Sequence, residues 1–263
     1  MNSVFLLGDS VSHSLSPAMQ NAAFEALHID CRYLVRQVGR ADLAGAVEDM
    51  RVDDEILGAN VTIPHKESVI ALLDELDPLA RRIGAVNTIS RQSGRLKGWN
   101  TDVDGFRQAL RDISLPRSRG RVGVGALAYH RVAIIGAGGA ARAVAAALPP
   151  DAEVWVIARH VDQAGRLCRD LAIERGLPMG IDRMQAAIES AELVVNATPA
   201  DLPPVSWLRP EQRVFDLRSR RSVEGRTMLL HQGAASFEIW TGRPASLAAM
   251  RAALERAAEA VTA

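Results

Sequence analysis

One segment near the middle of the chain constrains the fold more than any other. An apolar run over residues 131–135 leads directly into a glycine-rich turn, Gly136-Ala137-Gly138-Gly139-Ala140-Ala141, and an alanine-rich helical stretch follows. A strand, a Gly-x-Gly-x-x-Ala turn and a helix form the arrangement that binds the pyrophosphate of a dinucleotide. An ordinary tight turn would also use glycine, but the flanking strand and helix favour a cofactor site. The free N–H groups at the start of the helix would then face the phosphates.

The segments on either side of this turn predict an α/β protein. Short runs typical of strands stand at 4–7, 31–38, 56–62, 85–90, 95–99, 153–158, 193–196 and 214–217. Helical patterns stand between them at 17–27, 42–50, 68–73 and 162–175, and a packing helix is expected from 246 onward. Strands that alternate with helices indicate mostly parallel sheets covered on both faces. Residues 113–130, which combine Pro, Gly and Arg, are expected to link two parts of the chain.

Composition argues against several classes of protein. The 263 residues contain 31 basic and 31 acidic side chains, so no net positive field favours nucleic acid or an anionic membrane as partner. The first apolar run has no basic leader, and no apolar segment approaches the ~18 residues of a membrane span. The only two cysteines, Cys31 and Cys168, have no metal-like spacing and suit a reducing compartment. We therefore expect a cytoplasmic protein without a metal, either a monomer or a homodimer.

The end of the strand after the glycine-rich turn indicates which cofactor the turn would bind. An acidic residue about 20 residues after the turn holds the adenosine ribose of NAD. This chain has Ala158-Arg159-His160 at that point and no carboxylate before Asp162. An arginine there can pair with the 2′-phosphate of NADP. We predict NADP, while NAD remains possible if Arg159 is only a solvated residue at a strand end.

Four polar clusters in the first hundred residues suggest a site for a polyhydroxy acid. They stand at the expected carboxyl ends of strands or in the following turns, where ligands bind in open α/β sheets. Hydroxyls, carboxamides, an ammonium and a carboxylate are the groups such an acid requires. Singly, each has a structural explanation: Ser16 as a helix cap, Asn87 in a turn, Asp102 as an exposed acid. The clusters are Ser12–Pro17, Gly58–Lys66, Gly84–Thr88 and Asn100–Asp102.

Lysine is rare in this chain, because among the basic residues only Lys66 and Lys97 are lysine. Arginine serves equally well on a solvated surface. A lysine that stands among arginines therefore suggests a role that guanidinium cannot fill, such as proton exchange near neutral pH.

In this order the motifs closely resemble those of the shikimate dehydrogenase family. The resemblance covers residues 4–110 and 131–245 and is carried by HSLSP, GANVTIPHKE, IGAVNTI, GWNTDVDGF, GAGGAARA, MLLHQ and FEIWTG. It implies an NADP-dependent oxidoreductase of aromatic amino acid biosynthesis that interconverts shikimate and 3-dehydroshikimate, or a related ring acid, by hydride transfer. It also implies an α/β substrate-binding catalytic domain over 1–103, completed by helices at 226–263. A Rossmann-type NAD(P)-binding domain over 104–225 would face it across a cleft.

Matched position by position, the functional residues of the family fall on both parts of the chain. Lys66 and Asp102 match the catalytic pair, and Lys66 would either donate a proton or supply positive charge as an alkoxide forms. Ser14 and Ser16 would hold the substrate carboxylate, and Asn60, Asn87, Asp102 and Gln232 would address ring hydroxyls. The full substrate pocket maps to Ser14, Ser16, Asn60, Thr62, Asn87, Thr101 and Gln232. The cofactor site maps to Gly136, Ala137, Gly138, Gly139, Ala140, Arg159 and Thr198.

Three departures from the family pattern lie in the cofactor part. Ala158-Arg159-His160 stands where the family usually has Asn-Arg-Thr, and Asp201-Leu202 stands where a Gly-Met pair is usual. A D-x-x-Y-x-P stretch is replaced after Asp216, so that Ser219 takes the place of the tyrosine and Gln232 follows early. The arginine-rich run over 218–221 is either a solvated loop or a new anion contact.

These departures leave two alternatives open. One is a dehydrogenase for quinate or an amino analogue of shikimate that uses NAD. The other is a catalytically weak binding or regulatory paralogue that retains the pocket: the intact Lys66 and Asp102 argue against it, and the shortened 217–231 region argues for it. A folate-linked dehydrogenase with the same two-domain layout is disfavoured by the serine pair in HSLSP and by the NTD motif.

Overall fold

A computed structural model describes residues 1–114 and 129–262, which form two compact units. Unit 1 comprises Met1–Gly105 and Leu229–Ala263, and unit 2 comprises Phe106–Met228. The chain passes between the units within two helices, α4 (Asp102–Ser114) and α8 (Val223–Thr241). Most of the linker predicted over 113–130 lies outside the described residues.

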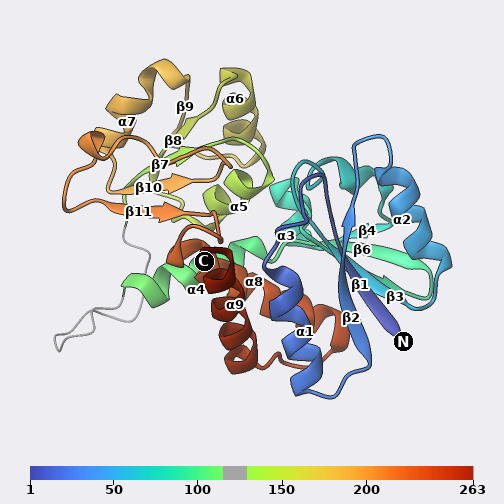
Figure 1. Cartoon of the computed structure of the whole chain (residues 1–263). Helices are drawn as coiled ribbons and strands as arrows, with labels where there is room; N and C mark the ends of the chain where they lie inside the picture. The colour runs from blue at the N-terminus through green and yellow to red at the C-terminus, as the bar shows by residue number, and fades with distance from the viewer. Residues whose placement is uncertain (115–128, 263) are drawn as a thin grey trace. The chain divides into compact units, whose positions relative to one another are not determined.

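Unit 1 is built on a six-stranded mixed sheet with the strand order β2-β1-β3-β5-β6-β4 (Figure 1). Strand β1 is parallel to β2 and β3, β4 is parallel to β6, and β5 is antiparallel to both β3 and β6. The antiparallel step arises because β5 and β6 form a hairpin around Ser93 and Gly94, which both have positive φ. The strands are β1 (Asn2–Gly8), β2 (Cys31–Gln37), β3 (Ile56–Val61), β4 (Glu75–Leu76), β5 (Thr88–Gln92) and β6 (Arg95–Trp99).

Side chains of β1 alternate between two apolar clusters, one on each face of the sheet. Val4 and Leu6 join a cluster with Phe24 of α1 and Met250 of α9. Leu7 joins the other cluster, together with Met50 of α2. The helices and helical turns of unit 1 are α1 (Ser16–Ala26), α2 (Leu43–Val52), η1 (Ser68–Leu72), α3 (Pro78–Ile83) and α9 (Leu247–Thr262), with the greater part of α8.

One edge of this sheet gathers the polar clusters. Strands β1, β3 and β6 end there, because β1 is parallel to β3 and the antiparallel β5 separates β3 from β6. For the same reason β5 begins there, and Thr88 pairs with both Asn60 and Trp99. Residues 84–87 therefore lie at the same edge because they precede the amino end of β5. The sequence analysis instead expected residues 85–87 to be part of this strand. Ser16 is the first residue of α1 rather than its cap.

Unit 2 contains a five-stranded, fully parallel sheet with the order β11-β10-β7-β8-β9. The chain enters at β7, in the centre, continues outward through β8 and β9, and returns to β10 and β11 on the other side. The strand order therefore reverses at β7, and ligands of open α/β sheets bind at such a switch point. The strands are β7 (Arg131–Ile135), β8 (Glu153–Ile157), β9 (Gly176–Met179), β10 (Leu193–Asn196) and β11 (Arg213–Asp216). The helices are α5 (Gly139–Ala147), α6 (Val161–Asp170), η2 (Ile181–Arg183), α7 (Met184–Ser190) and η3 (Val205–Trp207).

The helix predicted over 162–175 ends earlier than expected. Ala172 has φ +49, and the N–H of Ile173 donates to the Cys168 carbonyl at 3.0 Å, as at a helix end with one left-handed residue. The chain then forms β9, an edge strand that the sequence analysis missed. Gly176 and Pro178 are typical of turns, but an edge strand tolerates both.

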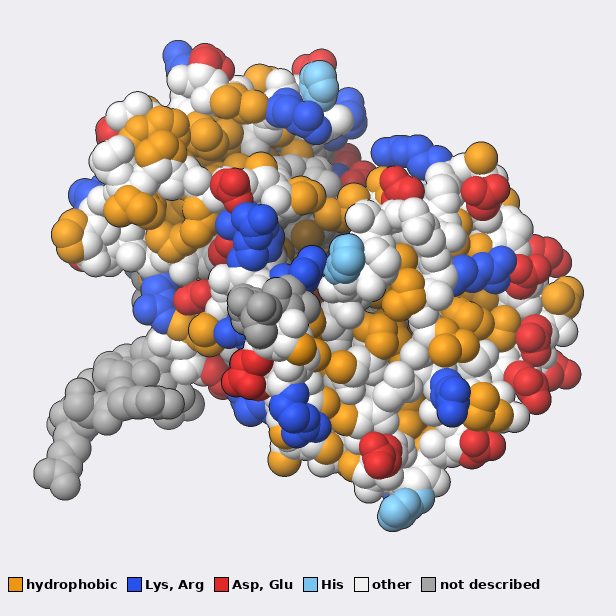
Figure 2. All heavy atoms as spheres, viewed as in Figure 1, with side chains coloured by type: hydrophobic (Ala, Val, Ile, Leu, Met, Phe, Trp, Pro, Cys, Tyr) orange, Lys and Arg blue, Asp and Glu red, His pale blue; other side chains and the backbone are white. Residues whose placement is uncertain are grey.

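Acidic and basic side chains are interspersed on the face shown in Figure 2, and neither sign dominates it. Among the helices of the described part of the chain, none is long and apolar enough to cross a membrane.

Gly58 is expected to be essential for the stability of unit 1. It has φ +157, and a Cβ atom there would overlap the Ile89 carbonyl oxygen and lie 2.7 Å from Trp240 Nε1, which donates to that oxygen at 2.9 Å. We expect Gly58→Ala to lower the free energy of unfolding by about 1–3 kcal/mol, because the backbone at Gly58 or at Ile89 would have to shift to remove the overlap. The measurement is the urea midpoint at constant m value.

Gly45 provides the matched control for this substitution. It is exposed within α2, and a Cβ atom there would meet nothing within 4 Å. Gly45→Ala is therefore expected to stabilise the protein by about 0.5–1 kcal/mol, through helix propensity alone. Equal midpoints for the two variants would contradict the packing argument for Gly58.

Candidate active site and cofactor-binding turn

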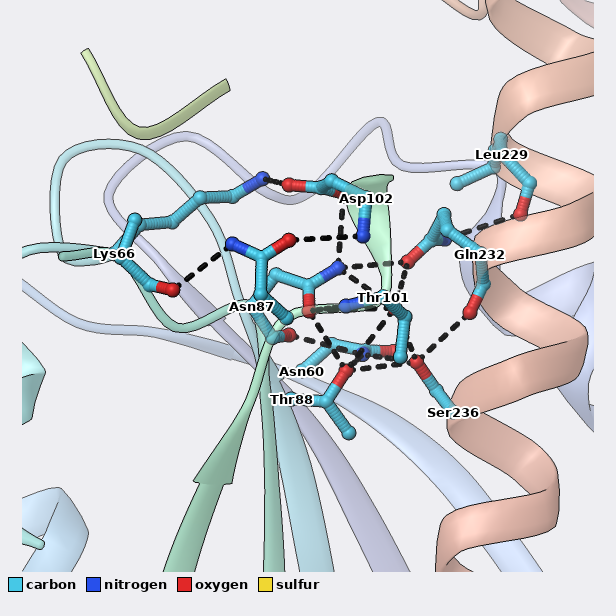
Figure 3. Close-up of polar contacts among 11 residues, drawn as sticks. Asn60, Lys66, Asn87, Thr88, Thr101, Asp102, Leu229, Gln232 and Ser236 are labelled. Carbon is cyan, nitrogen blue, oxygen red and sulfur yellow. Dashed lines mark hydrogen bonds and ion pairs between the residues drawn. The ribbon is translucent and has the colours of Figure 1, made fainter. Parts of the chain in front are cut away.

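An ammonium–carboxylate pair occupies the polar edge of the unit 1 sheet (Figure 3). Lys66 Nζ lies 2.6 Å from Asp102 Oδ2, and their side chains are only 13% and 6% exposed. Lys66 is in the turn after β3, where its carbonyl accepts from Val86 N–H at 2.7 Å. Asp102 begins α4, so the amino end of this helix favours its negative charge. The pair brings together two residues that are 36 positions apart in the chain.

Asn87 is the central residue of the polar network around this pair. Its Nδ2 donates to Asp102 Oδ1 at 2.8 Å, to Thr101 Oγ1 at 2.9 Å and to Gln232 Oε1 at 3.2 Å. Its Oδ1 accepts from the Thr101 N–H at 2.8 Å, which sets the amide orientation because that partner can only donate. The carboxylate of Asp102 is therefore held by donors on both of its oxygens.

Gln232 reaches this network from α8. A Cβ atom on Gly105 of α4 would lie 2.7 Å from the Gln232 Cβ, so glycine permits the close approach of the two helices. Gln232 Nε2 donates to the Leu229 carbonyl at 3.0 Å, which leaves its Oε1 to face Asn87.

Three further residues, which the sequence analysis did not assign, complete the network below Asn87. Asn60 Nδ2 faces Thr88 Oγ1 at 3.0 Å and Ser236 Oγ at 3.1 Å, and its Oδ1 accepts from the Tyr33 hydroxyl at 2.8 Å. Burial raises the pKa of the Tyr33 phenol, and a hydrogen bond with Ser16 offsets part of that rise, so Tyr33 acts as a neutral donor. Thr88 follows Asn87 directly, and Ser236 lies one helical turn beyond Gln232. These spacings could have indicated both residues.

The predicted carboxylate-binding serines lie after β1. Ser14 Oγ donates to Ser16 Oγ at 3.2 Å and accepts from Ser16 N–H at the same distance. Through the contact between Ser16 and Tyr33, this pair joins the network around Asn60. Thr62 is half-buried directly after β3, where its methyl group would be 2.5 Å from a Cβ atom on Gly8. Among the described residues, no side-chain hydrogen bond links Thr62 to the network.

In unit 2 the glycine-rich turn has the geometry that a pyrophosphate requires. Gly136 follows β7 with φ +113, and its N–H donates to the Ile157 carbonyl at 2.8 Å. Gly138 is the residue before α5, is exposed, and has nothing within 4 Å of a hypothetical Cβ atom, so a ligand can approach its backbone. Gly139 and Ala140 form the first turn of α5, and Ala141 is fully buried against the sheet. The start of α5 thus offers free N–H groups at an open surface.

The other predicted cofactor residues lie at the carboxyl ends of neighbouring strands. Arg159 is exposed just after β8, beside the buried Ala158 and the exposed His160. Ala137 lies in the turn itself. Thr198 follows β10, and its Cγ2 would be 2.9 Å from a Cβ atom on Gly136, so it packs directly against the turn. These residues therefore lie along the ligand-binding edge of the unit 2 sheet.

The arginine-rich run is held by ion pairs within unit 2. Arg218 donates from Nε and Nη2 to Asp216 Oδ2, at 2.9 and 2.7 Å, and from Nη1 to Asp201 at 2.7 Å. Arg221 Nη1 also donates to Asp201, at 2.5 Å. Of the two interpretations left open for this run, the solvated loop does not hold for Arg218, which is only 15% exposed.

In the shortened region between β11 and Gln232, the chain enters α8 through a capped amino terminus. Ser222 Oγ donates to the Asp216 carbonyl at 2.6 Å and accepts from Gly225 N–H at 2.8 Å, which caps α8. A Cβ atom on Gly225 would lie 2.8 Å from Ser219 N, so glycine permits this packing. Helix α8 can therefore begin almost directly after β11.

Comparisons with known proteins agree with this geometry. Residues 6–89 match the shikimate dehydrogenase substrate binding domain, residues 120–224 match shikimate / quinate 5-dehydrogenase, and residues 225–255 match the shikimate 5′-dehydrogenase C-terminal domain. The shikimate dehydrogenase (NADP(+)) of Moorella thermoacetica is 41% identical over 97% of this chain and 92% of its own length. That of Methanopyrus kandleri is 38% identical over 96% and 94%.

Solved structures show the same two-unit α/β fold. Shikimate 5-dehydrogenase from Thermus thermophilus, in complex with NADP(H) and shikimate, superposes with a TM-score of 0.81 at 34% identity, covering 98% of this chain and 100% of that one. Quinate dehydrogenase from Corynebacterium glutamicum, in complex with NAD, superposes with a TM-score of 0.80 at 26% identity, covering 97% and 99%. The matches extend over nearly the whole chain, and the chain belongs to the shikimate dehydrogenase family.

Proposed function

We propose that this protein interconverts shikimate and 3-dehydroshikimate with NADP(H). The observation that carries the proposal is the Lys66–Asp102 pair, 2.6 Å apart and largely shielded from solvent, within a network of carboxamides and hydroxyls. The relatives named shikimate dehydrogenase (NADP(+)) support both the substrate and the cofactor.

Lys66 is the residue best suited to the proton chemistry of this reaction. A cofactor held at the Gly136 turn would supply the hydride for the ring carbonyl carbon, and negative charge would then develop on the carbonyl oxygen. The Lys66 ammonium stabilises that charge and has a proton to give, while the Asp102 carboxylate holds the ammonium in place. In the direction of oxidation, the same pair receives the hydroxyl proton.

The substrate would be bound by groups from five segments of unit 1. Ser14 and Ser16, which already share a hydrogen bond, suit a carboxylate because each has a hydroxyl to donate. Asn87, Asp102 and Gln232 present amide and carboxylate groups to ring hydroxyls, and Thr101 orients Asn87. Asn60 offers a further carboxamide to the ring hydroxyls, and Tyr33 and Thr88 hold it in place. Thr62 completes the pocket after β3.

For the cofactor, the turn formed by Gly136, Ala137, Gly138, Gly139 and Ala140 would hold the pyrophosphate, with Thr198 packed against it. Arg159 is exposed at the end of β8 and would pair with the 2′-phosphate of NADP. No carboxylate is present at residues 158–160 to accept hydrogen bonds from the free ribose hydroxyls of NAD.

One alternative is supported by a specific relative, the NAD-bound quinate dehydrogenase of Corynebacterium glutamicum. The missing asparagine at position 158 would weaken 2′-phosphate binding and favour such a cofactor. A panel of shikimate, quinate and aminoshikimate against NADP and NAD tests both readings. We expect the highest kcat/KM for shikimate with NADP, measured as the rate of reduced cofactor formation. Preference for quinate with NAD would overturn the proposal, and binding without turnover would support the regulatory alternative.

The thiols of Cys31 and Cys168 are free and buried, which fits the cytoplasmic location expected from the sequence. The monomeric or homodimeric state stays a prediction.

A further inference from the structure

The loop after β10 forms one wall of the dinucleotide-binding turn. The Thr198 methyl would be 2.9 Å, and the Ala197 carbonyl oxygen 3.3 Å, from a Cβ atom on Gly136. No side chain could separate these backbones, so a displacement of Ala197 or Thr198 would change the surface of the turn. The position of this loop therefore decides the shape of the surface that Gly136 presents.

Thr198 is fixed from inside the unit by Asn196, which is fully buried. Asn196 Oδ1 accepts from the Thr198 N–H at 3.1 Å and from its hydroxyl at 2.8 Å. Asn196 Nδ2 donates to the Ala200 carbonyl at 2.9 Å and to Asp216 Oδ1 at 3.3 Å. The base of the loop is thus tied to Asp216 at the end of β11.

The outer part of the loop is tied to the same carboxylate through arginine. Arg218 spans Asp216 and Asp201, and Arg221 adds a second cation to Asp201. Donation to Asp216 raises the pKa of Arg218, and the hydrogen bond from Arg218 holds the pKa of Asp201 below its ordinary value. Asp216 and Arg218 are 5% and 15% exposed, whereas Asp201 and Arg221 are 80% and 65% exposed. The ion pairs therefore run from the interior of unit 2 to its surface.

Two of the departures from the family pattern meet in this contact. By the resemblance described above, Asp201 stands at a position where glycine is expected, and Arg218 and Arg221 belong to the run that stands in place of the expected tyrosine-containing stretch. Asp201 alone would lack both of its arginine partners, and the arginines alone would lack the contact that joins them to the loop. Together they form a new tether between the segments after β10 and β11.

We propose that Asp201, Arg218 and Arg221 form an ionic clasp that positions the 197–202 loop for binding of NADP(H). This inference rests on the proposed function, because it assumes that the Gly136 turn binds the cofactor. Asp201 is a positioning residue: it acts through the loop backbone and Thr198. Loss of the clasp leaves the base of the loop held by Asn196 while its outer part loses its tether to β11.

The test uses the full-length protein and measures NADP binding and turnover separately. Asp201→Asn keeps the size of the side chain and removes its charge. We expect it to raise both the Kd and the KM for NADP by about three- to tenfold, which is the range for a mostly exposed ion-pair network. The KM for shikimate and the thermal midpoint should remain near wild type. Asp201→Glu should restore most of the affinity.

Salt and charge exchange make the test specific to the ion pairs. The ratio of the Kd values of Asp201→Asn and wild type should approach one as NaCl is raised, because salt screens exposed charges. The double variant Asp201→Arg with Arg221→Asp should bind NADP more tightly than Asp201→Arg alone. Arg220→Ala, which removes an exposed charge from the same run, serves as the control and should bind as wild type does.

Failure of the clasp and failure of the proposed function have different signatures. If wild type binds NADP and Asp201→Asn binds it equally well at low salt, the clasp is wrong. If affinity falls but the KM for shikimate rises in parallel, Asp201 has only a general structural role. If wild type itself binds no NADP, the proposed function is wrong and the clasp falls with it.

Discussion

Replacing Lys66 with alanine is expected to lower kcat for NADPH formation from shikimate by about 10²- to 10⁴-fold. The Lys66 ammonium lies 2.6 Å from Asp102 Oδ2, at the polar edge of the unit 1 sheet. It is the cation that takes part in the proposed reaction. Alanine removes both the proton and the charge that the developing alkoxide needs. The measurement is the steady-state rate of reduced cofactor formation, with near-ultraviolet circular dichroism to show that the fold is retained.

The second lysine of the chain provides the matched control for this substitution. Lys97 lies on β6, with its ammonium 4.3 Å from the centroid of the Trp99 ring, and Lys97→Ala should keep kcat near wild type. Lys66→Arg separates the two roles of Lys66, because arginine keeps the charge but cannot exchange a proton near neutral pH. Wild-type turnover by Lys66→Ala would contradict the assignment of this residue.

The parts of the fold that follow from local chemistry were predictable from sequence. Strands β6, β7 and β10 have the bounds that the apolar runs indicated, and the Gly136 turn lies between a strand and a helix as expected. These features depend on residues close together in the chain. By contrast, the end of α6 and the strand β9 depend on Ala172 adopting a left-handed conformation, which alanine rarely does.

The candidate site was predictable in its residues but not in its connections. The motifs named Lys66, Asn87 and Asp102, and the structure brings the side chains of Lys66 and Asn87 into hydrogen-bonding distance of the Asp102 carboxylate. The supporting network escaped the sequence analysis because Tyr33 and Ser236 matter only as partners for buried polar groups. The spacing from Gln232 could have marked Ser236 as a neighbour of the site, but its contact with Asn60, 176 positions away, becomes visible only when the fold places the two segments together.

The partners of the arginine-rich run over 218–221 also could not be identified from the sequence. The sequence left open whether residues 218–221 were solvated or met an anion, and neither reading foresaw that the anions would be Asp201 and Asp216 of the same unit. Ion pairs between neighbouring parallel strands depend on the strand order, which a charge pattern alone does not encode. The pairing of β10 with β11 is what brings the two loops together.

Asp102→Asn is expected to reduce kcat by about 10² or more, although asparagine has nearly the same shape. Both oxygens of Asp102 face donors, since Oδ2 accepts from Lys66 and Oδ1 accepts from Asn87 Nδ2. An asparagine at this position must point its own amide N–H₂ at one of these donors, whichever way it is turned. The variant therefore loses the charge and also one hydrogen bond. Asp104→Asn, an exposed change in the first turn of the same helix, should remain within about twofold of wild type.

A double-mutant cycle tests whether Lys66 and Asp102 act as one unit. If Asp102 works by holding and orienting the Lys66 ammonium, its loss should matter little once that ammonium is gone. The variant Lys66→Ala with Asp102→Asn is therefore expected to be about as slow as Lys66→Ala alone. Rate losses that multiply would instead show independent roles and would contradict a shared proton-handling pair. The cycle is informative because the two oxygens of Asp102 have different partners. In Lys66→Ala, Asn87 can still donate to Asp102 Oδ1, so only the partner of Oδ2 is lost.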